Sequence, residues 1–196
     1  VDVGGGTTDL TLIRVALGDN GPRLTRVAVG DHILLGGDNM DHALARLCEP
    51  ALAGGTGAHL PAVRFAQLVE QCRQAKESLL GARPPERTAI TLLGSGSKLI
   101  GGHLSTELSR EQAIETVVHG FFPEVGLDAR PALRRGALME FGLPFAADAA
   151  ITRHVAAFLD RHRMVMAEAH GLTLAQAARD PARILPDAVL FNGGVF

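Results

Sequence analysis

The sequence has little net charge, no long apolar run and only two cysteines. Its formal net charge is −2 with both signs interspersed, so we expect neither a nucleic-acid-binding stripe nor a polybasic membrane patch. No apolar run reaches about 18 residues, so the sequence predicts no transmembrane helix. Cys48 and Cys72 are not spaced like a redox or zinc pair, and each falls on the apolar side of a predicted helix. We therefore expect free core thiols in a reducing compartment, the cytoplasm.

The chain has ample apolar residues for a core, but its ends predict a piece of a longer protein. At 196 residues and 46% hydrophobic content it has room for one large domain or two small ones. It starts at Val1 without a methionine, and Asp2 already lies inside a glycine-rich motif. It stops at Phe196, two residues after a Gly-Gly pair.

The glycine-rich motif at the start consists of Asp2, Val3, Gly4, Gly5, Gly6, Thr7, Thr8 and Asp9. Residues 10–15 alternate after it, which predicts a hairpin with the glycines at its tip. Glycine permits positive φ and lets successive N–H groups point into one concavity that binds phosphate oxygens. Thr7 and Thr8 add hydroxyl donors, while Asp2 and Asp9 bracket the tip and suit a hydrated Mg²⁺. A tight glycine turn with two solvated aspartates is the alternative.

A second glycine motif, Gly36-Gly37-Asp38, precedes a predicted helix. The glycines end extended structure, and Asp38 suits the N-cap. The expected apolar face of this helix is Met40, Leu44, Leu47 and Cys48. A Gly-Gly turn that leads into a helix N-terminus is also an anion site, through its free N–H groups and the helix dipole. A plain capped helix start is the alternative.

Residues 61–80 give the clearest helix in the chain, with Pro61 at its start and Gly81 after its end. The expected buried stripe is Phe65, Leu68, Val69, Cys72, Ala75 and Leu79. Another part of the surface carries Arg73, Lys76, Glu77 and Leu80 at spacings i, i+3, i+4 and i+7. This part is either a binding face or a solvated helix face. Arg73 and Glu77 stand at i and i+4, where opposite charges can pair.

The following segments predict a second hairpin and another helix. Strands are expected over 87–93 and 98–105. Ser109 and Gln112 form a capping box that opens a helix. The expected inward residues of that helix are Ile114, Val117, Val118 and Phe121.

Towards the end of the chain, Asp148 is expected to cap a long helix whose buried face continues to Met166. Residues 186–192 then have the pattern of a buried strand. This strand leads into the last glycine pair, Gly193 and Gly194.

The opening motif resembles the second phosphate-binding hairpin of the actin-like ATPase superfamily. It is most similar to that of the DnaK-type heat shock protein 70 chaperones, which reads Asp-Leu-Gly-Gly-Gly-Thr-Phe-Asp, although actin-like filament proteins and hydantoinase-type enzymes share the motif. At the position of residues 35–41 these chaperones have Leu-Gly-Gly-Glu-Asp-Phe-Asp, and a later strand ends in Val-Gly-Gly-Ser near Gly193 and Gly194. The resemblance is strong over 1–112 and 186–194 and poor between these ranges.

This resemblance implies that ATP or ADP binds with Mg²⁺ between two lobes. Asp2 and Asp9 would position Mg²⁺ through its waters and, with Thr7, would be the catalytic residues. The residues implied to hold the phosphates and the adjoining part of the nucleotide are Gly4, Gly5, Gly6, Thr7, Gly36, Gly37, Asp38, Gly193 and Gly194.

The helix at 61–80 departs from the family. The chaperone helix reads Glu-Arg-Ala-Lys-Arg-x-Leu-Ser and its exposed face cradles the adenosine, so Arg73, Lys76, Glu77 and Leu80 are the corresponding cofactor-binding candidates. Lys76 matches the family. Arg73 stands in place of the glutamate, Glu77 in place of the second arginine and Leu80 in place of the serine. Phosphate binding is therefore more strongly implied than adenine recognition.

The order of elements resembles that of an actin-like (ribonuclease H-like) ATPase lobe, an α/β fold. Residues 1–36 and 109–196 would form its core, and 37–108 would form an inserted α+β subdomain. The parent would be a heat shock protein 70-like chaperone with another lobe and a C-terminal domain. A co-chaperone or nucleotide-exchange factor would bind the inserted subdomain. We expect ATPase activity of the parent and not of this stretch alone.

Two other function classes stay open. A sugar or metabolite kinase of the same superfamily would need a substrate pocket and a base in the first lobe. A nucleotide-sensing pseudo-ATPase, or an interaction module with an altered adenine pocket, is favoured by the substitutions at Arg73, Glu77 and Leu80.

Overall fold

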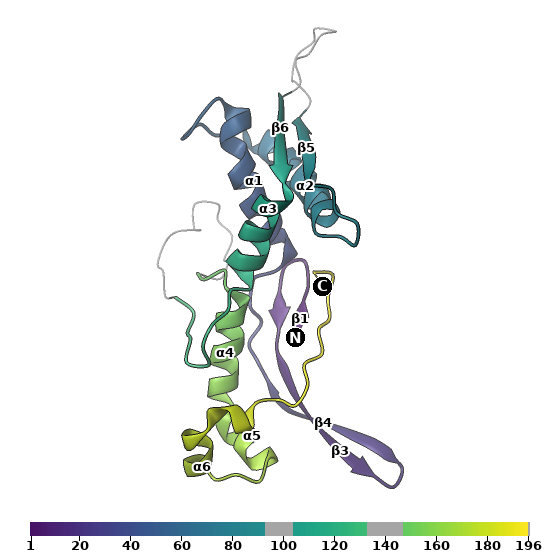
Figure 1. Ribbon diagram of the computed structural model, residues 1–196, viewed down its shortest axis with the longest axis vertical. Coiled ribbons are helices and arrows are strands. Elements are labelled where there is room, and N and C mark those ends of the chain that lie inside the picture. The colour runs from purple at the N-terminus through teal and green to yellow at the C-terminus, as the bar shows by residue number, and fades with distance from the viewer. Residues whose placement is uncertain (93–103, 133–146, 196) are drawn as a thin grey trace. The chain divides into compact units, whose positions relative to one another are not determined.

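A computed structural model describes residues 1–92, 104–132 and 147–195 (Figure 1). The chain divides into two compact units, Val1–Gly37 with Glu124–Phe196 and, separately, Asp38–Pro123. In the described residues, the first unit combines helices with two two-stranded antiparallel sheets, and the second combines helices with one such sheet. The described chain is therefore a mixed α/β protein. The domain division at 36/37 and 108/109 stays a prediction. Among the residues described, none of the helices is long and apolar enough to cross a membrane.

The opening hairpin of the first unit is formed by β1 (Asp2–Val3) and β2 (Thr8–Asp9). The strands are antiparallel, with Asp2 opposite Asp9 and Val3 opposite Thr8. The predicted glycine tip is therefore confirmed. Val3 and Thr8 are fully buried and anchor the hairpin in the unit, while Gly5 and Gly6 at the tip are exposed.

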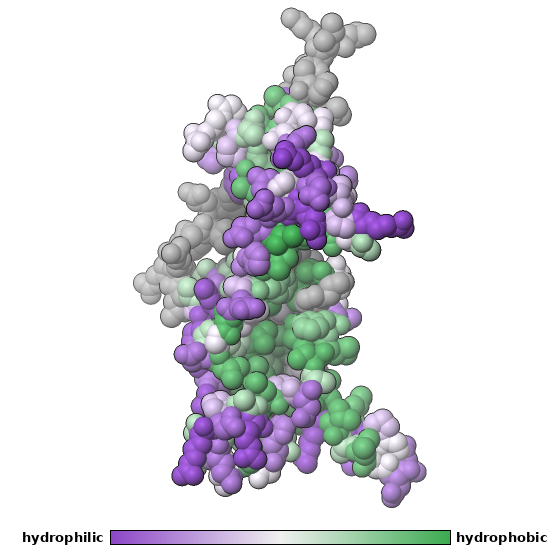
Figure 2. Space-filling view, in the orientation of Figure 1, coloured by the Kyte–Doolittle hydropathy of each residue, from purple (hydrophilic) through white to green (hydrophobic). Residues whose placement is uncertain are grey.

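A longer hairpin follows, formed by β3 (Thr11–Gly18) and β4 (Gly21–Val29). Gly18 pairs with Gly21 across a two-residue turn, and the φ of +101° at Gly21 explains why glycine stands there. Hydrophobic side chains remain on the surface of this hairpin, as Figure 2 shows for its region of the molecule. The large apolar residues exposed on it are Ile13, Val15, Leu17, Leu24 and Val29.

The described part of the first unit also contains the helices α4 (Ile151–Arg161), α5 (Arg163–Ala169) and α6 (Leu174–Arg179) and a 3₁₀ turn, Pro181–Ile184. Their small core consists of Met166, Ala167, Ala177 and Ile184, with Leu12, Leu159 and Leu172 packed against it. The single long helix predicted after Asp148 is wrong. The backbone leaves helical geometry at His162, with φ −102° and ψ 17°, and separates α4 from α5.

The N-cap residue of α4 is Ala150, so the prediction that Asp148 occupies the N-cap position is wrong. The carboxylate of Asp148 accepts hydrogen bonds from the N–H groups of Ala150 and Ala132, at 2.9 and 2.7 Å, and pairs with Arg153 at 2.9 Å. Burial would raise the pKa of Asp148, but these hydrogen bonds and the Arg153 charge outweigh it and hold the pKa below its ordinary value.

The buried strand predicted over 186–192 is wrong for most of its length. Asn192 forms a parallel bridge with Asp2, whereas the preceding residues have no strand assignment. Val189, Leu190 and Phe191 are 56%, 80% and 58% exposed. The apolar run predicted burial on both sides, but these side chains remain largely exposed, and Leu190 and Asn192 form backbone hydrogen bonds with Val1 and Val3.

The second unit contains two long helices, α1 (Gly37–Ala53), which begins at the boundary, and α2 (Ala62–Leu79). α2 confirms the helix predicted over 61–80 and packs on β5 (Arg87–Leu92). The buried faces include Met40, Leu44, Cys48, Leu68, Cys72, Ala75 and Leu79. Leu47, predicted on the buried face of α1, is 45% exposed. At 100° per residue it lies at the edge of the stripe that Leu44 and Cys48 define.

β5 pairs with β6 (Leu104–Ser109) over the whole of both strands. The predicted strand over 98–105 falls mostly outside the described residues, as does the turn between the strands, and the described strand runs on to Ser109. The capping box of Ser109 and Gln112 is confirmed at the start of α3 (Arg110–Ala113). The helix continues as a π-helical segment, Ile114–His119, which turns Val118 outward to 40% exposure although an inward position was predicted.

Candidate functional site

The β1–β2 hairpin is closed tightly at its glycine tip. The N–H of Gly4 donates to the carbonyl of Thr7 at 2.8 Å. The second glycine motif lies directly against this tip, because the N–H of Gly37 donates to the carbonyl of Gly4 at 3.0 Å. A Cβ on Gly36 would lie 2.5 Å from the carbonyl oxygens of both Gly4 and Gly5. Only glycine fits at position 36 without moving the hairpin.

The third glycine motif reaches the same hairpin from the end of the chain. The N–H of Val3 donates to the carbonyl of Asn192, and the N–H of Asn192 donates to the carbonyl of Val1, both at 2.9 Å. Gly193 has φ +102°, and a Cβ there would lie 2.1 Å from the carbonyl oxygen of Val3. This backbone approach again requires glycine.

Two other glycines of the motifs are not required by the packing of the chain. A Cβ on Gly6 or on Gly194 would meet no atom within 4 Å, and neither residue has positive φ. The space beside these two glycines is therefore open, in contrast to the crowded backbone at Gly36 and Gly193.

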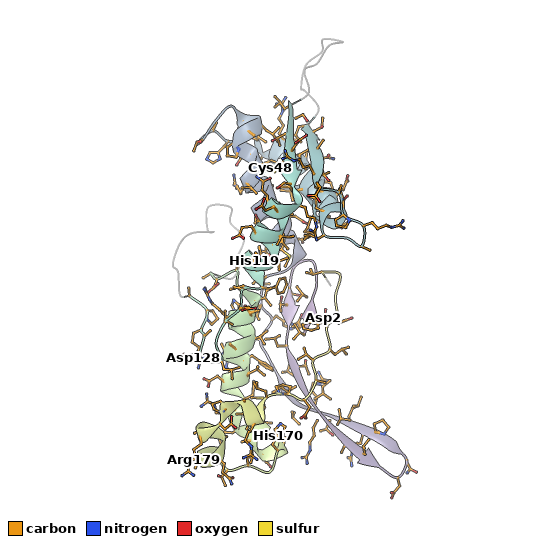
Figure 3. The ribbon with its side chains drawn as sticks, in the orientation of Figure 1. Asp2, Cys48, His119, Asp128, His170 and Arg179 are labelled. Atoms are coloured by element: carbon orange, nitrogen blue, oxygen red, sulfur yellow. The ribbon has the colours of Figure 1, made fainter. Side chains whose placement is uncertain are left out.

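Two carboxylates face each other across the hairpin. Asp2, labelled in Figure 3, stands directly opposite Asp9. Like charges in directly opposite positions repel each other, so this pair favours a nearby cation or hydrogen-bond donors. Asn192 donates from Nδ2 to Asp2 at 3.0 Å. The Thr7 hydroxyl donates to Asp9 at 3.2 Å.

His32 also reaches the site, with its ring Nδ1 in close contact with a carboxylate oxygen of Asp9. Sequence reasoning missed this residue, since nothing in the pattern around position 32 points to a partner at position 9. The second threonine plays a different part from the first. Thr8 is fully buried and its hydroxyl donates to the carbonyl of Leu35 at 2.8 Å, so the expectation that it offers a ligand donor is wrong.

The carboxylate oxygens of Asp2 and Asp9 suit Mg²⁺, because this ion prefers oxygen ligands. A cation would also relieve the repulsion between the two carboxylates. Among the residues that the structure describes, no group of three or more His, Cys, Asp or Glu side chains forms a metal-binding cluster. A Mg²⁺ ion held by these two carboxylates would therefore keep most of its water ligands, as this ion generally does.

In the second unit, a buried carboxylate joins α1 to α2. The side chain of Asp41 is 1% exposed and pairs with Nε of Arg73 at 2.9 Å and with Nζ of Lys76 at 2.6 Å. Arg73 also contacts Asp38 through Nη2 at 2.8 Å. The hydrogen bond and charge of Asp41, followed by the charges of Asp38 and Glu70, raise the pKa of Arg73.

These contacts change the expected role of two candidates on α2. The predicted pair of Arg73 with Glu77 is wrong, because Arg73 turns to the carboxylates of α1 instead. Lys76 is likewise engaged by Asp41. Glu77 is exposed and Leu80 is half-buried just after the helix. The pairing with Asp41, which sequence reasoning missed, follows the packing of α1 on α2.

The structure thus brings the predicted residues together in two groups. Around the hairpin of the first unit lie Asp2, Gly4, Gly5, Gly6, Thr7, Asp9, Gly36, Gly37, Gly193 and Gly194. Asp38, Arg73, Lys76, Glu77 and Leu80 belong to the second unit.

The comparisons with known proteins are sparse. No protein-family model matches the chain. Over 113 residues it is 34% identical to a chaperone protein HscA homolog of Variovorax paradoxus (strain S110). That match covers 57% of the chain but 16% of the relative, so the chain corresponds to a small part of that chaperone's length. The similarity is distant and partial, and it points in the same direction as the glycine motifs.

Proposed function

We propose that the chain binds the phosphates of ATP or ADP, together with Mg²⁺, on its β1–β2 hairpin. The observation that carries this proposal is the meeting of three glycine motifs, far apart in sequence, at one hairpin. Gly36 and Gly193 pack where no side chain fits, while Gly6 and Gly194 border open space. A ligand that approaches the backbone closely explains why glycine stands at the two open positions as well.

The chemistry of such a site is mainly positioning and charge stabilisation. Exposed backbone around Gly5 and Gly6 would face phosphate oxygens, and the Thr7 hydroxyl would add a donor. Asp2 and Asp9 would hold Mg²⁺ through its waters, and the ion when bound would neutralise phosphate charge. Gly37, at the start of α1, would adjoin the phosphates.

We further propose that the chain is part of the ATP-binding domain of a heat shock protein 70-like chaperone. The order of its glycine motifs and the partial similarity to an HscA homolog support this assignment. The fold would be the actin-like (ribonuclease H-like) lobe, with 1–36 and 109–196 as core and 37–108 inserted. In the longer cytoplasmic protein, a second lobe, a C-terminal domain and an exchange factor or co-chaperone would be its partners, and hydrolysis would need the second lobe.

A second candidate function is nucleotide sensing without turnover. It is favoured by one observation, the engagement of Arg73 and Lys76 by Asp38 and Asp41. In this proposal the hairpin would still bind phosphates, while Arg73 and Lys76 would contribute little to base recognition because α1 already engages them. Turnover by the longer protein, measured as phosphate release, distinguishes the two functions.

Calorimetric titration with Mg²⁺-ADP tests the phosphate site. Gly6→Ala is the informative variant, since a Cβ at Gly6 meets nothing in the protein and its φ suits alanine. We expect the variant to fold normally and to bind at least tenfold more weakly, because the methyl group would occupy the ligand's space.

Gly18→Ala is the matched control, because a Cβ there has only an ordinary contact, 3.7 Å from the Gly21 carbonyl oxygen, at the far end of β3. It should bind like the unaltered protein. Absence of Mg²⁺-nucleotide binding, or equal affinity of the Gly6→Ala variant, would refute the proposed site.

A further inference from the structure

The β3–β4 hairpin has an apolar face on the opposite side from the residue that joins it to the core. In an antiparallel pair, residues directly opposite each other share a face, and so do residues two apart along one strand. The residues of this face, called here the outer face, are Ile13, Val15 and Leu17 of β3 with their partners Arg26, Leu24 and Pro22 of β4. By the alternation of β3, Leu12 belongs to the other face, and it packs against the core of the first unit.

The outer face is exposed and mainly apolar. Val15 and Leu24 stand opposite each other at its centre and are 59% and 67% exposed, and Leu17 beside the turn is 90% exposed. The other face of the same stretch carries Arg14 and Arg23. Antiparallel sheets normally bury their apolar face and leave the polar one in water. Within the described first unit the outer face is left uncovered, so it is suited to contact another molecule (Figure 2).

Opposite charges stand at the two ends of the outer face. Arg26 lies at the base of the hairpin, opposite Ile13, and Asp19 lies in the turn at its tip. Both residues are exposed, and in the described part of the chain neither forms an ion pair. A surface that is apolar at its centre, positive at one end and negative at the other is complementary to a copy of itself turned end for end.

We propose that the outer face is a self-association surface, on which two copies of the chain pack face to face as a two-fold symmetric dimer. The tip of each hairpin then lies over the base of the other. Val15 and Leu24 of the two copies pack together at the centre, as in stacked sheets about 10 Å apart. At both ends, Asp19 of one copy pairs with Arg26 of the other copy.

The charges of the hairpin also limit the assembly to two copies. Arg14 and Arg23 remain in water on the other face, where they would repel the same face of a further copy. A two-fold axis closes the contact, because both copies use the same surface. The surface belongs to a single hairpin and is smaller than the about 800 Å² per partner of a standard interface, so we expect a weak and reversible dimer. None of these residues belongs to the proposed phosphate site.

Sedimentation velocity tests the proposal over about a hundredfold range of protein concentration, since reversible association depends on concentration. We expect the unaltered chain to shift from monomer to dimer and to stop there. The double substitution Val15→Thr with Leu24→Thr should weaken the dimer at least tenfold, because threonine suits a strand but places hydroxyl groups in the contact. Ala16→Thr, on the other face of the same strand, is the matched control and should dimerise like the unaltered chain.

Three results would overturn the proposal. The first is a monomer at every concentration. The second is equal association of the double variant and the Ala16→Thr control, which would place the contact on another surface. The third is growth beyond the dimer, as open-ended pairing of strand edges would give. All the substituted side chains are exposed, so the core should fold normally in each variant.

Two charge reversals test the end-for-end arrangement. Asp19→Arg or Arg26→Asp alone would bring like charges together at both ends, and each should weaken the dimer about tenfold, an effect that salt screens. An equimolar mixture of these two variants should dimerise again, because every end contact between the different chains joins a positive and a negative side chain. Unweakened single variants, or a mixture that stays as weak as they are, would overturn the proposed dimer.

Discussion

The buried carboxylate of Asp41 gives the sharpest test of how α1 and α2 are held together. Asp41→Asn keeps the shape of the side chain but removes the charge that faces Arg73 and Lys76. The structure supplies a matched control in Asp38, which lies on the same helix and shares the partner Arg73. The side chain of Asp41 is 1% exposed and that of Asp38 is 49% exposed, so the two variants differ in burial and in the second partner of Asp41, Lys76.

The expected magnitude follows from this difference. Removing one member of a buried ion pair typically costs about 3–5 kcal/mol, because the partner's charge is left uncompensated. Lys76 is 15% exposed and Arg73 is 42% exposed and keeps Asp38, so water and Asp38 offset part of that cost. We expect Asp41→Asn to lower the free energy of unfolding by about 2–3 kcal/mol. Asp38→Asn should cost less than about 1 kcal/mol, as exposed pairs do.

Urea unfolding monitored by far-ultraviolet circular dichroism measures both values, since the chain has no tryptophan or tyrosine to report by fluorescence. With a urea dependence of about 2–3 kcal/mol per molar, the midpoint for the Asp41 variant should fall by about 1 M. At about 1 M salt the effect of Asp38→Asn should vanish because exposed charges are screened, while that of Asp41→Asn should persist. A loss for Asp38→Asn as large as that for Asp41→Asn would refute the reasoning.

Three further predictions concern the hairpin and the acid stability of the fold. Gly36→Ala should destabilise the first unit by about 1–3 kcal/mol, because its Cβ would overlap two carbonyl oxygens, whereas Gly194→Ala should be neutral; thermal unfolding compares the pair. If the parent protein is the proposed ATPase, Asp9→Asn in it should slow ATP hydrolysis by about 10²–10³ while nucleotide affinity changes less. Single-turnover phosphate release measures this rate, and an unchanged rate would remove Asp9 from the proposed site. Burial would raise the pKa of Glu49, but hydrogen bonds from Leu60, Arg46 and His59 lower it, and the pKa of Asp148 is lowered as well. Both carboxylates therefore contribute stability at neutral pH, and this stability is lost as the pH falls through their folded-state pKa values. Asp148→Asn should therefore reduce stability at pH 7 and flatten its decline below about pH 4; an unchanged acid transition would contradict this.

Local patterns in the sequence were sufficient wherever the interactions are local. The glycine tip at 4–6, the helix over 61–80 and the capping box of Ser109 and Gln112 each depend on a few neighbouring residues, and the structure confirms them. Where a pattern implied burial by a distant element, it was less reliable. Residues 186–192 have the composition of a buried strand, yet Leu190 is 80% exposed because a strand needs neighbours that its own sequence cannot specify.

The candidate site shows the same division. The residue types of the proposed phosphate site could be recognised in the sequence, since glycine, threonine and aspartate keep their conformational and hydrogen-bonding properties wherever they stand. The close approach of Gly36 to the carbonyl of Gly4, and of Gly193 to that of Val3, depends on folding of distant segments and is visible only in the structure. The same holds for the contact of His32 with Asp9.

In the second unit, the sequence placed Arg73 and the two cysteines on amphipathic helices, but it assigned Arg73 the wrong partner. A helical pattern determines which face a residue occupies and which residues lie three or four positions away. It contains no information on how two helices pack against each other. The packing of α1 on α2 brings Asp41 to Arg73, and this long-range packing could be known only from the folded chain.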